Sequence, residues 1–228
     1  PTAVAGSGFN VLTLTMSATS GLTGTDSGTE PTVDYTESVT EGNRVQDESV
    51  STNDLADFSG ETIVDEAAPA QVVGSGWPDY QDTDGDGQVD ELDFAVSEGG
   101  VVIVFDDGDW ADTANDLTGF DITGYNGISG TLVTMDITAN ADLTGVSGGT
   151  EPTFAFMPIT GSIQDPSGNS TGGILGTSLN DNANPIVTGE AYQDDGDDGS
   201  VDRLVLDFSE DVTWNGSDLS QFSVTAND

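Results

Sequence analysis

The sequence predicts an all-β protein built from antiparallel β-sandwiches, and three observations support this prediction. First, apolar residues alternate with polar ones along several short segments, most clearly at 132–139, where Val133, Met135 and Ile137 share one face. Second, 30 glycines and 8 prolines separate these segments and leave no long helical pattern. Third, the segments recur with a period of about 115 residues, a length typical of one sandwich.

Four further segments have the pattern of strands. Residues 9–18 alternate in the same way as 132–139, and residues 92–96 and 204–208 place an apolar side chain at every second position. Residues 101–105 instead form a continuous apolar run. That run predicts a strand that is buried on both faces.

An internal repeat organises the chain. The segment from Tyr80 to Leu92 recurs from Tyr192 to Leu204, and both copies lead into a Ser-Glu pair, at 97–98 and 209–210. The repeat is imperfect, since Gly196 replaces the carboxylate of Asp84 and Arg203 replaces Glu91. We therefore expect the two copies to share a backbone structure and to differ in the ligands that they offer.

A second repeated block and a repeated junction define the order of the units. Residues 22–32 recur at 143–153, and the motif Asp-x-Ala-x-Pro occurs at 65–69 and again at 181–185. The sequence thus resembles a window taken from a longer tandem array. We predict three parts: the C-terminal half of one repeat at 1–68, a complete repeat at 69–184 and the N-terminal half of a further repeat at 185–228.

The charge of the chain limits its environment and its partners. The sequence holds 42 acidic residues, only two basic ones (Arg44 and Arg203), and no lysine, which gives a net charge of −40. Such self-repulsion destabilises a compact state in dilute buffer, whereas molar salt shortens the Debye length to about 3 Å. We therefore expect a halophilic protein that folds in concentrated salt or with bound divalent cations. We expect no binding to nucleic acid, and anionic membrane surfaces are poor partners, because both require the basic groups that this chain lacks.

The residue types that are missing argue against an enzyme. The chain has no cysteine and no histidine, which excludes disulfides, ordinary zinc sites and Ser-His triads. Paired carboxylates can cleave glycosides, but acidic residues are so frequent here that their proximity in sequence carries little information. No nucleophile elbow or phosphate-binding loop is present. No apolar run reaches the ~20 residues of a membrane span, so we expect no membrane insertion of this segment.

The strongest motif is a predicted calcium loop. Residues 82–93 place carboxylates at positions 1, 3, 5, 9 and 12 and glycine at position 6, which is the ligand spacing of an EF-hand loop. Because a strand pattern follows, we expect the loop to lie outside a true EF-hand; a solvated acidic turn is the alternative. The predicted Ca²⁺ ligands are Asp82, Asp84, Asp86, the carbonyl of Gln88, Asp90 and Asp93.

The second copy of the loop is degraded. Its predicted metal ligands are Asp194, Asp198 and Asp202, at positions 1, 5 and 9, while Gly196 replaces the third carboxylate and Val205 stands at position 12. Binding of an ion here is left open.

Two tripeptides match the acceptor sequence for N-glycosylation. They begin at Asn169 and Asn215, and both lie in Gly/Ser-rich contexts that are typical of loops. Such tripeptides also arise by chance in chains rich in serine and threonine, so both interpretations stay open.

The repeated pattern resembles a known group of proteins. Asp-x-Asp-Gly-Asp-Gly-x-Val-Asp, a strand, Ser-Glu and then Phe-x-[Ile/Val]-Thr is similar to the Ig-like repeats of prokaryotic S-layer and surface-adhesion proteins, in particular those of haloarchaea and salt-adapted bacteria. The resemblance implies tandem Ig-like antiparallel β-sandwich domains, an extracellular or cell-surface location, calcium binding and a structural role.

The expected function is therefore that of an S-layer, stalk or filament subunit that assembles with itself into a homopolymer or lattice. The alternative is an adhesin, a glycan- or cell-binding module on an Ig-like stalk. We expect calcium to stiffen the junctions between units, with Asp65, Glu66 or Asp181 contributing across the boundary. The break in the middle of a unit also permits one chain to complete the sandwich of another.

Overall fold

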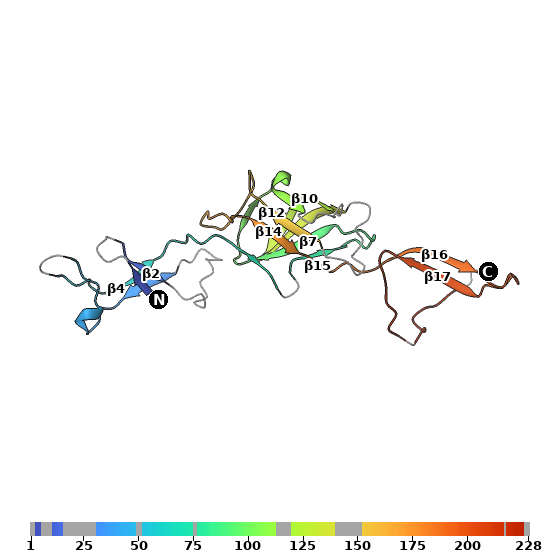
Figure 1. The fold of residues 1–228 in the computed structure, drawn as a ribbon, viewed down its shortest axis with the longest axis horizontal. Helices are drawn as coiled ribbons and strands as arrows, with labels where there is room; N and C mark the ends of the chain where they lie inside the picture. The colour runs from blue at the N-terminus through green and yellow to red at the C-terminus, as the bar shows by residue number, and fades with distance from the viewer. Residues whose placement is uncertain are drawn as a thin grey trace.

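The protein is all-β. The computed structural model describes residues 3–5, 11–15, 31–48, 52–74, 77–112, 120–139, 152–216 and 218–225. Within these ranges the regular structure consists of strands and two short 3-10 helices, η1 (Glu41–Asn43) and η2 (Asp107–Asp109). The strands form three groups along the long axis of the molecule, with the two smaller groups on opposite sides of the central one (Figure 1).

The main sheet of the central group is almost entirely antiparallel. Its strands follow the order β10 (Phe120–Ser129), β11 (Leu132–Ala139), β7 (Glu91–Val96), β6 (Asp79–Gln81) and β15 (Asn180–Asp181). The short strand β5 (Gln71–Val72) pairs with β7 beyond the end of β6. Only β15 runs parallel to its neighbour, β6.

A second layer covers the apolar face of this sheet. It contains β14 (Ile174–Ser178), β12 (Thr153–Phe156) and β9 (Trp110–Asp112), in that order. Phe94 of β7 lies 5.4 Å from the ring of Phe154 on β12 and 5.9 Å from Trp110 on β9. The side chains of both layers belong to one buried apolar cluster. The central group is thus a sandwich-like structure whose core lies between two antiparallel sheets.

One predicted strand differs from the structure. The run 101–105 was expected to be buried on both faces, but β8 (Val102–Val104) exposes Val102 and Val104. The reason is its position, since β8 pairs only with β13 (Ser162–Gln164) in a separate two-stranded sheet. Val101, just before the strand, is the residue of this run that is fully buried.

The N-terminal group repeats pairings of the central group. Strand β1 (Ala3–Ala5) pairs with β2 (Thr13–Thr15), and Val4 lies opposite Leu14 as Tyr125 lies opposite Met135. Strand β3 (Thr32–Tyr35) pairs with β4 (Phe58–Thr62) in the same register as β12 with β14. Both of these pairs have an irregularity at the same place, before Tyr35 and before Phe156.

The C-terminal group is a hairpin with the register of β6 and β7. Strands β16 (Val187–Gln193) and β17 (Arg203–Phe208) pair so that Tyr192 lies opposite Leu204, as Tyr80 lies opposite Leu92. The predicted strands at 92–96, 132–139 and 204–208 are confirmed as β7, β11 and β17. Of the predicted strand at 9–18, the described part contains β2.

Among the residues that the structure describes, no helix has the length and apolar character needed to cross a membrane.

Candidate cation sites

The loop after β6 gathers three carboxylates. Asp82, Asp84 and Asp86 place oxygen atoms within 4.8 Å of one another. The loop wraps around Asp82, whose Oδ1 accepts hydrogen bonds from the backbone N–H groups of Gly85 (2.7 Å) and Asp86 (3.2 Å) and whose Oδ2 accepts one from Gly87 (2.8 Å). Both glycines have positive φ angles, 74° and 90°, a conformation that other residues rarely adopt.

The predicted ligands at positions 9 and 12 lie outside this three-carboxylate group. Asp90 accepts hydrogen bonds from Thr83, through the backbone N–H (3.0 Å) and the hydroxyl group, and so closes the loop. Asp93 lies on β7 and is buried, with Oδ2 accepting a hydrogen bond from Gln81 Nε2 at 2.9 Å. Burial raises the pKa of Asp93. Gln88 donates its backbone N–H to Asp86 Oδ1 at 2.8 Å.

The loop lies against the start of the C-terminal hairpin. A Cβ atom at Gly87 would come within 2.6 Å of Ile186 Cδ1 and 3.7 Å of Ser209 Cβ. Ile186 and Ser209 in turn bind each other, since Ser209 donates its N–H to the carbonyl of Ile186 at 2.9 Å and its hydroxyl group accepts from Ile186 N–H at 3.1 Å. The Asp82 loop is therefore in contact with the junction between the central group and β16.

The second loop repeats the hydrogen bonds that the first loop makes from its positions 5 and 6 to the first aspartate. Asp194 accepts hydrogen bonds from the N–H groups of Asp198 (3.2 Å) and Gly199 (2.7 Å), the counterparts of Asp86 and Gly87, and also from Gly196 (3.1 Å). These bonds lower the pKa of Asp194. Asp202 accepts from Asp195 N–H at 3.0 Å. Within the described residues, Asp194, Asp198 and Asp202 form no group as tight as that of the first loop.

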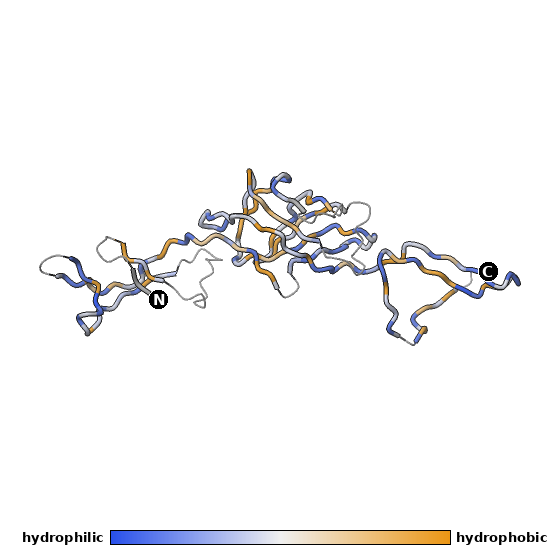
Figure 2. The backbone as a smooth tube through the Cα atoms, viewed as in Figure 1, coloured by the Kyte–Doolittle hydropathy of each residue, from blue (hydrophilic) through white to orange (hydrophobic). Residues whose placement is uncertain are grey.

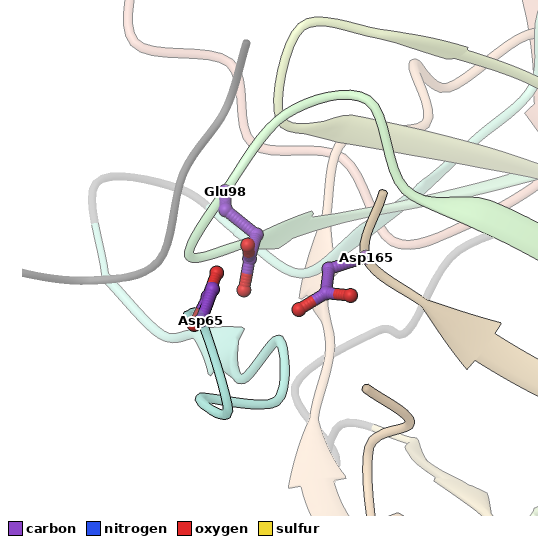
Figure 3. Close-up of side chains that lie close together, drawn as sticks. All are labelled: Asp65, Glu98 and Asp165. Carbon is purple, nitrogen blue, oxygen red and sulfur yellow. The ribbon is translucent and has the colours of Figure 1, made fainter. Parts of the chain in front are cut away.

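A second cluster of carboxylates joins three distant parts of the chain. Asp65, Glu98 and Asp165 bring carboxylate oxygens within 4.8 Å of one another, and their side chains converge in Figure 3. Asp65 comes from the Asp-x-Ala-x-Pro junction, Glu98 follows β7 and Asp165 follows β13. Glu98 and Asp165 are buried, whereas Asp65 is half-buried.

Asn169 holds two sides of this cluster in place. Its backbone N–H and its Nδ2 each donate to one carboxylate oxygen of Asp165, both at 2.7 Å. The same Nδ2 donates to the backbone carbonyl of Asp65 at 3.0 Å. Asn169 was predicted as a glycosylation acceptor, and a glycan on Nδ2 would displace at least one of these two bonds. The other predicted acceptor, Asn215, is exposed.

The elements of this cluster recur elsewhere in the chain. Glu210 follows β17 as Glu98 follows β7, and burial together with the charge of Asp181 raises the pKa of Glu210. Asp181 occupies the same position of the second junction motif as Asp65 does in the first. In the N-terminal group, Asn53 donates its N–H (2.9 Å) and Nδ2 (2.7 Å) to Asp47, as Asn169 does to Asp165.

Both arginine side chains form ion pairs with carboxylates outside the Asp65–Glu98–Asp165 cluster. Arg44 forms ion pairs with Glu37 (3.0 Å) and Asp54 (2.8 Å), and Arg203 pairs with Asp195. Carboxylates held this close together repel one another, and burial strengthens the repulsion. Carboxylate oxygens are the ligands that hard cations such as Ca²⁺ prefer. The cluster can therefore bind a divalent cation and be stabilised by it.

Sequence reasoning identified Asp65 as a contributor at the junction but missed Glu98 and Asp165. The Ser-Glu pair after each copy of the loop was a usable signal, because it marks the same position in both repeats. Asp165 carries a weaker signal, since its counterpart Asp47 lies in a loop that is two residues longer.

Searches of protein families, curated proteins and solved structures found no match to this chain.

Proposed function

We propose that this protein is a structural, calcium-stabilised subunit of an extracellular surface layer, stalk or filament that is adapted to high salt. Its sandwich-like units would be tandem Ig-like repeats, with half-units at 1–68 and 185–228 and a complete unit at 69–184. The observation that carries the proposal is the cluster of Asp65, Glu98 and Asp165, in which a junction residue meets two buried carboxylates.

A cation in this cluster would fix the junction to the central unit. Asp65 belongs to the segment that leads from the N-terminal group, whereas Glu98 and Asp165 belong to the body of the central unit. A bound ion therefore couples the position of the segment to the folded sandwich. Because the ion binds the folded state and not the unfolded chain, it also raises stability by mass action.

The Asp82 loop would serve the second junction in the same way. Its three carboxylates lie in a loop whose Gly87 is in close contact with Ile186, the residue before β16. Ordering the loop with Ca²⁺ would stiffen this contact. Each junction of the chain thus has a cation site within reach, which supports a mechanical function over a sensory one.

The adhesin alternative needs an exposed aromatic surface. The most exposed aromatic side chains of the C-terminal group are Tyr192, Trp214 and Phe222. Tyr192 and Phe222 are the repeat counterparts of Tyr80 and Phe120, which are buried in the central core. This equivalence indicates that the exposed aromatic residues of the C-terminal group are core positions of a half-unit and not a ligand-binding surface.

Calorimetric titration with Ca²⁺ in molar NaCl tests the proposal. Glu98→Gln keeps the size of the side chain but removes one carboxylate from the cluster. We expect it to weaken calcium binding at the cluster by about tenfold or more, or ~1.4 kcal/mol. Glu61→Gln is the matched control, because Glu61 is exposed on β4, outside the cluster, and carries the same charge. Equal calcium binding by all three proteins would contradict the proposed site.

A further inference from the structure

Two buried aspartates lie opposite each other on the main sheet of the central group. Asp79 on β6 pairs with Asp93 on β7, and the two residues are only 5% and 4% exposed. Their chain neighbours Tyr80 and Leu92 belong to the apolar core, and hydrophobic and hydrophilic stretches alternate through the central group in Figure 2. Because successive side chains of a strand point to opposite faces, the two aspartates lie on the face of the sheet that is turned away from this core.

Each of the two carboxylates has one oxygen atom with hydrogen-bond partners and one without. Asp93 Oδ2 accepts a hydrogen bond from Gln81 Nε2 at 2.9 Å, and Asp79 accepts one from the side chain of Asn182. Within the described part of the chain, the Oδ1 atoms of Asp79 and Asp93 are buried and have no partner. A buried acceptor without a partner is unfavourable, and more so when it is charged. Two such oxygens on directly opposed residues therefore indicate a ligand that both can bind.

A second acidic pair lies beside the first on the same face of the sheet. Glu91 is two residues before Asp93 on β7, and Asp136 on β11 lies opposite Glu91. Glu91 is half-buried and Asp136 is exposed. This face thus carries four carboxylates in two adjacent rows, and the second row adds negative charge next to the buried pair.

The C-terminal hairpin shows that the strand pairing does not require these charges. Strands β16 and β17 have the register of β6 and β7, and the positions of Asp79 and Asp93 are occupied there by Ala191 and Val205. Ala191 and Val205 also lie directly opposite each other. The same backbone pairing therefore accommodates an apolar pair, whereas two like charges in that position destabilise it.

A divalent cation can neutralise the buried pair. The sequence has no lysine and no histidine, and Arg44 and Arg203 form ion pairs with other carboxylates. A proton neutralises one of two carboxylates and leaves the other charged. A divalent cation neutralises both, and it binds the oxygen atoms that lack a hydrogen-bond partner.

We propose that the central unit binds a divalent cation between Asp79 and Asp93, on the face of the main sheet that is turned away from the core. Directly opposed residues of antiparallel strands have Cβ atoms about 4.5–5.5 Å apart, and Ca²⁺ binds carboxylate oxygens at about 2.3–2.6 Å. One ion can therefore contact both Oδ1 atoms. Such an ion links β6 to β7 and replaces a repulsion between the two strands with an attraction.

This site changes the interpretation of Asp93. Its spacing predicted the twelfth-position ligand of the Asp82 loop, but in the structure it lies outside the group of Asp82, Asp84 and Asp86 and opposite Asp79. The site shares no residue with the Asp65–Glu98–Asp165 cluster, so it does not rest on the proposed function. Its ion stabilises the sheet of the central unit and not a junction between units.

Calorimetric titration with Ca²⁺ at neutral pH in molar NaCl tests the site in a chain whose other carboxylate groups are weakened. The parent for this test is the variant E98Q/D84N/D86N, which removes one carboxylate from the cluster and two from the loop. We expect this parent still to bind calcium. Adding D79A/D93V, which introduces the residues of the C-terminal hairpin, should reduce the number of bound ions by one per chain.

The matched control for this titration adds D121N/E61Q to the same parent. It removes two negative charges at exposed positions of β10 and β4, so it should leave the number of bound ions unchanged. No calcium binding by the parent would overturn the proposal, and so would equal binding by the D79A/D93V and control variants. Because Glu98 is already replaced in all of these proteins, the result does not depend on the proposed function.

Thermal unfolding separates a bound cation from a shared proton. With a chelator, D79A/D93V should unfold at a higher temperature than the parent, because an apolar pair replaces two opposed carboxylates. Calcium should then raise the midpoint of the parent more than that of D79A/D93V. Equal shifts would show that the pair holds only a proton and would overturn the proposal. Asp79→Asn, which removes a single charge, gives the same comparison if the double variant does not fold.

Discussion

Acidic side chains in this protein differ in function according to their burial and neighbours. Asp82 and Asp194 organise loops by accepting backbone N–H groups, and Asp165 is held by both donors of Asn169. Asp79 and Asp93 are different, because they are buried directly opposite each other on β6 and β7. One buried oxygen of each carboxylate, Oδ1, has no hydrogen-bond partner. Two like charges in such a position destabilise the sheet.

Replacing Asp79 with asparagine should therefore stabilise the protein at neutral pH. Burial and the charge of Asp93 raise the pKa of Asp79 to about 6. Because the folded pKa lies above the unfolded one, protonation favours the folded state; this stability is complete below pH ~4 and is lost as the pH rises through about 6. We expect D79N to gain about 1–2 kcal/mol of unfolding free energy above pH ~6.

Urea unfolding between pH ~4 and ~7.5, in molar salt with a chelator, measures this effect. Asp121→Asn is the matched control, since it removes one negative charge from an exposed position on β10. If both variants shift stability equally at every pH, the effect is one of net charge and not of the buried pair.

The second loop offers a gain of function at a single residue. A Cβ atom on Gly196 would lie 3.8 Å from Asp194 Oδ1 and 3.9 Å from Asp202 Oδ2. An aspartate at this position, where the first loop has Asp84, would therefore place its carboxylate close to those of Asp194 and Asp202. Gly196→Asp should therefore add calcium binding, seen as one more site in calorimetric titration. Gly196→Asn, which lacks the charge, is the control and should bind more weakly. Identical titrations of G196D and the parent protein would contradict this interpretation of the loop.

At the scale of the element, the Asp82 loop depends on one glycine for two reasons. Gly87 has a φ of 90°, and a side chain there would meet Ile186. Gly85 also has a positive φ, 74°, but open space surrounds it. Substituting Gly85 therefore tests the effect of backbone conformation alone, whereas substituting Gly87 tests that effect together with the contact at the junction.

Gly87→Ala should destabilise the protein more than Gly85→Ala. We expect the free energy of unfolding to fall by about 1 kcal/mol in the Gly85 variant, from the backbone conformation alone. The fall should be larger in the Gly87 variant, because Ile186 must move. Thermal unfolding in molar salt measures both. Adding Ile186→Ala to G87A should recover part of the extra loss. Equal losses at the two glycines would show that the loop does not press on the junction.

The sequence predicted the elements better than their surroundings. Alternation identified β7, β11 and β17, because one face of each strand has the composition of a core. The apolar run at 101–105 located β8 but wrongly predicted its burial, since a continuous apolar run does not reveal how many neighbours a strand has. The group formed by Asp82, Asp84 and Asp86 was predictable because these residues are close in sequence. Glu98 and Asp165 were not, because only the fold brings them to Asp65.

On the scale of the whole molecule, charge sets the conditions for folding. With 42 acidic residues against two basic ones, repulsion acts across all parts of the chain. The Debye length is about 10 Å at 0.1 M salt and about 3 Å at 1 M, so molar salt confines this repulsion to immediate neighbours. A divalent cation bound to a carboxylate cluster would act more locally, at a single junction.

Removing calcium and removing salt should therefore have different effects on shape. In X-ray scattering at molar NaCl, chelation should broaden the distribution of lengths, because the junctions loosen while the central unit stays folded. Dilution to about 0.1 M NaCl should expand the central unit itself. The Glu98→Gln variant in calcium should resemble the chelated protein. No change in dimensions on chelation would contradict a stiffening role for the cation.

The parallel pairing of β15 with β6 has a consequence for tension. Asn180 donates its N–H to the carbonyl of Pro78 and Asn182 donates to that of Tyr80, at 2.8 Å and 3.0 Å. The chain leaves the central unit directly after this pair. A pull toward the C-terminal group therefore drags β15 along β6, and these bonds bear the load together instead of opening one after another. The exit of the unit works as a shear clamp.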